Sequence, residues 1–158
     1  MKEDQELRDH LEKLMRMGQA FRPVGELLQG ISVQEAGGRV KDLPYTIWQL
    51  LEHLRFTQHD ILDFCRNSNY QEPAWPDDYW PSAESPSDQA ALDQTLQTVK
   101  QDLDAMVKLV QDTENDLFAP IPHGNGQTLL REAMLIAEHN AYHLGQIVVL
   151  RRLLGARL

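Results

Sequence analysis

The chain has 158 residues, 42% of them apolar and 25% charged, which is typical of one soluble globular domain with a sizeable core. Its formal charge of −9 would repel a phosphate backbone, so we do not expect nucleic acid as a partner. No apolar run could cross a bilayer, the charged N-terminus lacks the hydrophobic region of a secretory signal, and the single cysteine excludes an internal disulfide. We therefore expect one cytoplasmic domain over residues 1–158, with no membrane partner.

The first helical segment is predicted from about residue 4 to residue 29. Apolar side chains recur through it at helical spacing, and Pro23 and Gly25 are expected to bend or break the helix near its end. The next stretch, residues 32–44, indicates a connecting loop, because Gly37 and Gly38 interrupt any regular pattern.

The second helical segment is predicted to begin after Thr46 and to end near Asn67. Thr46 and Gln49 have the spacing of a capping box, in which each side chain bonds the other residue's backbone N–H. Apolar residues recur at helical spacing from Ile47 to Cys65, so one face of this helix should lie in the core.

The stretch from residue 67 to residue 88 contains four prolines and the aromatic residues Trp75, Tyr79 and Trp80. It has too many prolines for a helix, and large aromatic side chains in a loop normally pack against something. Two interpretations remain open and are compatible. The loop is a lid over one end of the core, or it forms a wall of a binding pocket.

Two further helical segments follow. The third is predicted over residues 88–115, with Ser85 and Pro86 as its cap and first turn. The fourth is predicted over residues 128–154, with Gly155 as a left-handed C-cap; the basic residues near that end are interpreted as complementing the helix dipole. Since no strand pattern is present, the sequence predicts an all-α fold, a four-helix bundle with long connecting loops.

Two histidines lie one turn apart in the fourth segment. His143 falls within the apolar arc of that helix, and His139 lies at the edge of the same arc. Imidazoles at positions i and i+4 stack on one face and can converge on a single metal ion. The alternative is a pair of hydrogen-bonded core histidines, because an HxxxH pair also occurs by chance in ordinary helices.

A metal site needs at least a third protein ligand. Among the remaining histidines, geometry favours His53, which lies at the margin of the apolar face of the second helix, with His123 in reserve. His59 is six residues further on, so it points ~120° away from His53. His10 lies near the exposed end of the first helix. A three-histidine set leaves coordination positions open for water or substrate, as catalytic sites do.

The joint pattern of "YTIWQLLEHLRFTQHDILDF" and "GQTLLREAMLIAEHNAYHLGQIVVLRRLLGA" resembles the DinB-like (YfiT-like) family of metal-dependent proteins. The resemblance covers nearly the whole chain. It implies a four-helix bundle, often dimeric, with a divalent metal, usually nickel or zinc, held by His53, His139 and His143. Some relatives are thiol-dependent transferases or isomerases, so the resemblance also implies a low-molecular-weight thiol as cofactor. In mycothiol-dependent relatives the first residue of the helix pair is often glutamate, and here it is His139.

Other residues near the histidines are interpreted either as part of the site or as ordinary structural residues. Gln146 either orients a ligand or makes an ordinary helix contact. Gly145 indicates close helix approach or room near the histidines. Glu52 and Asp60 are expected to face solvent, and Cys65 is expected to be a core residue and not a nucleophile.

Two functional hypotheses follow. The first is a metal-dependent hydrolase or thiol transferase acting on a small-molecule substrate. The second is a non-catalytic protein that binds a small ligand or acts in a stress response, with the aromatic loop contacting the ligand. A third expectation concerns assembly: apolar residues lie on almost all sides of the fourth helix around Ile147–Leu150, which favours a twofold homodimer.

Overall fold

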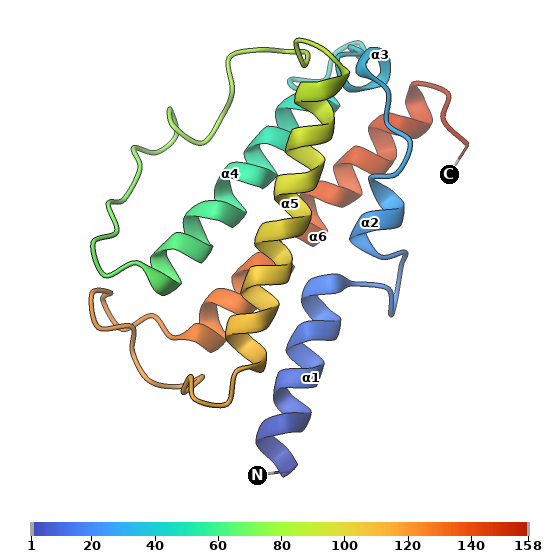
Figure 1. The fold of residues 1–158 in the computed structure, drawn as a ribbon. Coiled ribbons are helices and arrows are strands. Elements are labelled where there is room, and N and C mark those ends of the chain that lie inside the picture. Colours follow the sequence, from blue (N-terminus) through green and yellow to red (C-terminus); the bar gives the residue numbers. More distant parts are fainter. Residues whose placement is uncertain (1, 158) are drawn as a thin grey trace.

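The computed structural model describes residues 2–157 as an all-α fold with six helices (Figure 1). The long helices are α1 (Lys2–Arg16), α4 (Ile47–Arg66), α5 (Gln89–Gln111) and α6 (Leu129–Leu153), and the short ones are α2 (Val24–Leu27) and α3 (Val33–Ala36). Both α1 and α4 pack against α5 and α6, so the four long helices share one apolar core. The predicted all-α fold is confirmed, and no strand forms among residues 2–157.

The first helix is shorter than predicted. It ends at Arg16 because Met17 and Gly18 both adopt positive φ, at 62° and 92°, which no α-helix can continue through. The apolar pattern continued beyond this point because α2 buries Val24 and Leu27 in the same core. The predicted loop after it also contains a helix, α3, whose N-cap Ser32 accepts a hydrogen bond from the Glu35 N–H.

The local signals for helix ends were mostly right. The Thr46–Gln49 capping box of α4 is present, and Thr128 caps α6 in the same way through its side chain. Gly155 follows α6 with φ of +96°, as a left-handed C-cap requires. The predicted cap of α5 was wrong: Asp88, not Ser85, accepts the hydrogen bond from the first turn, and the helix begins at Gln89.

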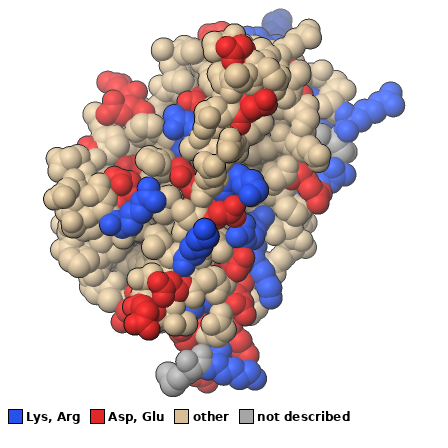
Figure 2. All heavy atoms as spheres, in the orientation of Figure 1, with Lys and Arg blue, Asp and Glu red and all other residues tan. Residues whose placement is uncertain are grey.

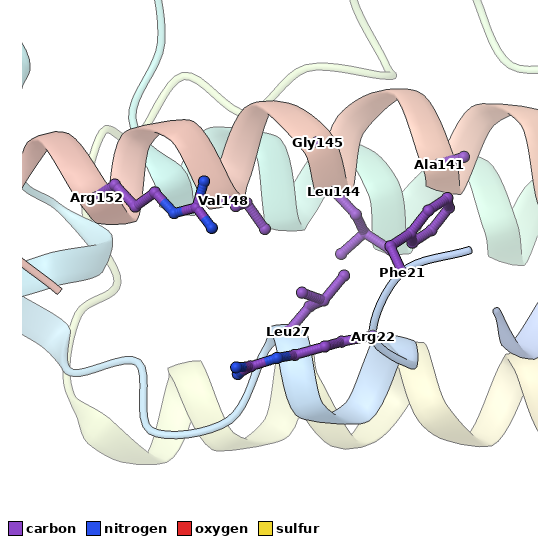
Figure 3. Close-up of a pocket in the computed structure, with 8 residues that line it drawn as sticks. All are labelled: Phe21, Arg22, Leu27, Ala141, Leu144, Gly145, Val148 and Arg152. Atoms are coloured by element: carbon purple, nitrogen blue, oxygen red, sulfur yellow. The ribbon is translucent and has the colours of Figure 1, made fainter. Parts of the chain in front are cut away.

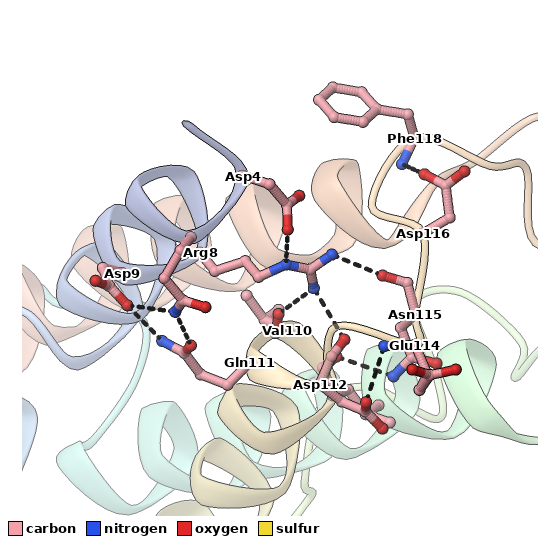
Figure 4. A network of polar contacts seen from close by, with 12 residues as sticks. Asp4, Arg8, Asp9, Val110, Gln111, Asp112, Glu114, Asn115, Asp116 and Phe118 are labelled. Atoms are coloured by element: carbon pink, nitrogen blue, oxygen red, sulfur yellow. Dashed lines mark hydrogen bonds and ion pairs between the residues drawn. The ribbon is translucent and has the colours of Figure 1, made fainter. Parts of the chain in front are cut away.

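Two buried arginines form hydrogen bonds with backbone carbonyls at helix ends and in the connections between helices. Arg8 on α1 donates to the backbone carbonyls of Val110, Asp112 and Asn115 at the end of α5, and to the carboxylate of Asp4 (Figure 4). Arg151 on α6 donates to the Leu27 and Gln29 carbonyls and to Glu35. Arg151 lies in the last turn of α6, as the dipole interpretation of these basic residues requires, and its buried guanidinium also satisfies these acceptors.

Gly145 faces open space and not a neighbouring helix. A side chain added there would meet no atom within 4 Å. The glycine lines a cavity of about 340 Å³ between α6 and residues 21–27, opposite Phe21 and Leu27 (Figure 3). Of the two interpretations of Gly145, close helix approach is excluded.

Charged side chains of both signs are interspersed over the face shown in Figure 2. None of the helices among residues 2–157 combines the length and the apolar character that a membrane span requires.

Candidate metal centre

Three histidine rings from two helices meet between α4 and α6. His53 on α4 and His143 on α6 are buried, and His139 is partly buried. The Nε2 atoms of His53 and His139 are 3.1 Å apart, and each of the three rings offers a nitrogen that lies within 4.8 Å of the other two. The histidines that sequence geometry selected are therefore the ones that the fold brings together.

Hydrogen bonds fix which nitrogen of His53 and of His143 faces the centre of the cluster. The Nδ1–H of His53 donates to the backbone carbonyl of Tyr79 at 2.9 Å, which leaves Nε2 as the free nitrogen. His143 Nδ1 bonds Gln146 Oε1 at 2.7 Å, and Gln146 Nε2 donates to the Tyr45 hydroxyl. The amide oxygen of Gln146 must accept, so Nε2 of His143 is free as well. Gln146 thus orients a ring, which was one of its two open interpretations.

Burial keeps the three imidazoles neutral. Desolvation lowers the pKa of His53 and of His143, and it lowers the pKa of His139 to about 3, with the two neighbouring rings adding to the effect. Neutral imidazole is the form that binds a metal ion. The cluster is therefore ready to accept a cation without first losing protons at neutral pH.

The separation of two of the three donor nitrogens fits a divalent metal ion. Two nitrogens that each lie ~2.0–2.1 Å from one ion are about 3 to 3.4 Å apart, from the right angle of an octahedral site to the tetrahedral angle of a zinc site. The His53 and His139 Nε2 atoms have this separation. Without an ion, the Nε2–H of neutral His139 donates to Nε2 of His53, and a cation bound between the two atoms would take the place of that proton.

The aromatic loop forms one wall of the cluster. The ring of Trp80 stacks on His53, with centroids 3.9 Å apart and planes 4° from parallel, and the Tyr79 carbonyl accepts from the same histidine. The pocket-wall interpretation of the 67–88 loop is thus supported. Sequence reasoning named Tyr79 and Trp80 as part of a candidate pocket wall but did not identify their contacts with His53, and it missed Tyr45, which acts through Gln146.

The other three histidines lie elsewhere. His59 is on the polar side of α4, half-exposed, and its Nδ1 is 3.0 Å from Asp102 Oδ2. His123, the reserve candidate, donates from Nε2 to the Phe64 carbonyl. His10 is exposed on α1. None of them belongs to the cluster, as the helical geometry predicted for His59.

Two carboxylates expected in solvent are in fact engaged. Glu52 accepts from Arg55 and from the Thr95 hydroxyl on α5, and Asp60 accepts from the hydroxyls of Tyr70 and Tyr79. Both expectations were wrong because partners distant in sequence supply the contacts. Cys65 packs against the core as expected, and burial raises the pKa of its thiol to about 12.

These features define a class: an all-α protein with a buried, neutral three-histidine cluster between two of its long helices. A family model described as the DinB superfamily matches residues 6–147, which is most of the chain. The protein therefore belongs to the DinB superfamily. No curated protein and no solved structure matches the chain.

Proposed function

We propose that this protein is a metal-dependent enzyme in which His53, His139 and His143 bind one divalent ion, with nickel or zinc as the metal. The observation that carries the proposal is the convergence of three neutral imidazole nitrogens, two of them oriented by hydrogen bonds from the opposite side of the ring. Membership of the DinB superfamily, whose members bind metals, supports it.

The ion would supply Lewis-acid chemistry, lowering the pKa of a water molecule or a thiol that it binds. The protein's own residues act around it. Tyr79 and Gln146 hold two rings in their binding orientation, and the Tyr45 hydroxyl fixes the Gln146 amide. Trp80 covers His53 and excludes water from that side.

The reaction we propose is hydrolysis of a small molecule or transfer of a low-molecular-weight thiol to an electrophile. Cys65 does not compete as a nucleophile, since its thiol stays protonated. The second candidate is a non-catalytic binding protein, favoured by the aromatic ring of Trp80 beside the cluster. Incubation with thiols and electrophiles separates the two, because an enzyme turns the pair over and a binding protein only saturates.

The metal proposal is tested on protein purified without a histidine tag. We expect about one equivalent of nickel or zinc per chain by elemental analysis, and its loss in His143→Ala. His59→Ala and His123→Ala are matched controls, since both residues lie outside the cluster and should leave the metal content unchanged. A fully stable protein without metal would contradict the proposal. So would equal metal content in His143→Ala and the wild-type protein.

We further propose that the protein is a cytoplasmic homodimer formed through the outer face of α6. Met134, Tyr142, Val149 and Leu153 are each more than half exposed, and their spacing places them along one side of the helix. Light scattering at micromolar concentration is expected to give twice the mass of the chain, and Val149→Lys is expected to give a monomer. A wild-type monomer would contradict this assembly.

A further inference from the structure

A second cavity, of about 570 Å³, lies along the same two helices as the histidine cluster, and none of the three histidines lines it. Residues from α4, α6 and the connections before α5 and α6 line it. Four aromatic rings form much of its wall: Phe64, Tyr70, Trp75 and Tyr79. Tyr79 belongs to both places, because its ring lines this cavity and its carbonyl holds His53.

A buried carboxylate with a free oxygen lies in this cavity. Glu132 on α6 is only 2% exposed. Its Oε1 accepts from Arg131 at 2.7 Å, and no group among residues 2–157 donates to its other oxygen. Thr57 also lines the cavity, with a buried hydroxyl that has no partner within the described chain. The second oxygen of Glu132 is not among the enclosed atoms that lack a partner, so it is open to the cavity, where a ligand group can donate to it.

The charges around the cavity favour a cation. Asp60, Glu72 and Glu132 line it, against the single cationic side chain of Arg131, which is itself half-exposed. Burial raises the pKa of Glu132, Arg131 opposes that shift, and the nearby Asp60 carboxylate adds to it. A positively charged ligand would relieve this repulsion, whereas an anion would increase it.

We propose that this cavity binds an organic ammonium group, a primary or alkylated amine carried on an apolar or aromatic body. The free oxygen of Glu132 accepts from the N–H of the ammonium, and the aromatic faces attract its charge. The apolar body of the ligand fills the space between the rings. A neutral or anionic molecule of the same shape lacks both interactions.

The position of the cavity relates this ligand to the histidines. Thr57 lies one turn beyond His53 on α4, and Leu135, which also lines the cavity, lies one turn before His139 on α6. A substrate bound by its amine at Glu132 would therefore extend toward the cluster. This placement rests on the proposed function, whereas ammonium binding in the cavity does not.

The test uses protein freed of metal with a chelator, so that it is independent of the histidine site. Benzylamine, benzyl alcohol and benzoate have similar shapes and differ in charge. At pH 7.5 we expect benzylamine to bind at least ~10-fold more tightly than the other two, by ligand-observed NMR. We expect Glu132→Gln to weaken benzylamine binding at least ~10-fold. Glu114→Gln, an exposed carboxylate outside the cavity, should leave it unchanged.

Trp75→Leu provides a second variant, because Trp75 is 69% exposed and its replacement should not disturb the core. It is expected to weaken benzylamine ~2- to 5-fold through loss of a cation–π contact. Equal binding of benzyl alcohol and benzylamine would overturn the proposal. Wild-type affinity for benzylamine in a folded Glu132→Gln protein would also overturn it, and if that variant does not fold, unchanged affinity in Trp75→Leu decides against it.

Discussion

Acidification provides a sharp test of the metal centre. An imidazole with the ordinary pKa of ~6.5 is about nine-tenths protonated at pH 5.5, so it costs a metal site roughly 10-fold in affinity. Three such ligands would cost roughly 1000-fold between pH 7.5 and pH 5.5. In this protein, burial lowers the pKa of His139 to about 3, so that ring stays neutral throughout this range. Burial also lowers the pKa of His53 and of His143. The expected loss is therefore below ~100-fold.

Competition for zinc between the metal-free protein and a chelator, calibrated at both pH values, measures this ratio. NMR of the metal-free protein gives an independent check, because the His139 ring signals should not shift between pH 7.5 and pH 4.5. A loss of affinity near 1000-fold would refute the reasoning. Titration of His139 near pH 6.5 would refute it as well, since the ring would then be hydrated and not buried as the fold places it.

Further predictions concern stability and ligand orientation. Between pH 6.5 and pH 3, His139 is protonated in the unfolded chain but stays neutral in the folded protein, because burial lowers its pKa to about 3. The free energy of unfolding of the metal-free protein should therefore fall by up to ~1.4 kcal/mol for each unit that the pH is lowered. Urea titration measures this dependence, and a flat profile would contradict it. Gln146→Leu should weaken metal binding ~10-fold or more, whereas His59→Ala should leave it unchanged, and equal effects would exclude the orienting role of Gln146. Arg8→Met removes the hydrogen-bond donors of three backbone carbonyls, so it should lower the free energy of unfolding by about 3 kcal/mol, as measured in thermal or urea melts. A decrease below ~1 kcal/mol would mean that water replaces the guanidinium as donor.

The long helices could be predicted because their signals are local. Apolar spacing and the Thr46–Gln49 capping box depend on residues within one or two turns, and α4, α5 and α6 follow them closely. The end of α1 could not be placed this way. Two successive residues with positive φ stop it, yet the apolar pattern continues into α2, because both helices face the same core.

The histidine set could be predicted for a similar reason. Positions i and i+4 share a helix face, so His139 and His143 had to lie together, and His53 lay at the margin of the apolar face of its own helix. The partners that orient the rings come from elsewhere. Tyr79 lies 26 residues from His53 and Tyr45 lies 101 residues from Gln146, and no local pattern specifies such contacts.

The groups that hydrogen-bond to the three histidine rings are uncharged, and this affects the chemistry that a metal ion bound there would support. Backbone and amide oxygens orient His53 and His143, and no carboxylate among residues 2–157 hydrogen-bonds to any of the three rings. Three neutral ligands leave the full charge of a divalent ion uncompensated, whereas thiolate or carboxylate ligands neutralise part of it. An ion held in this way would polarise a bound water or thiol strongly, which suits chemistry better than structural support. The uncharged oxygens that orient the rings would therefore favour the Lewis acidity that the proposed reaction requires.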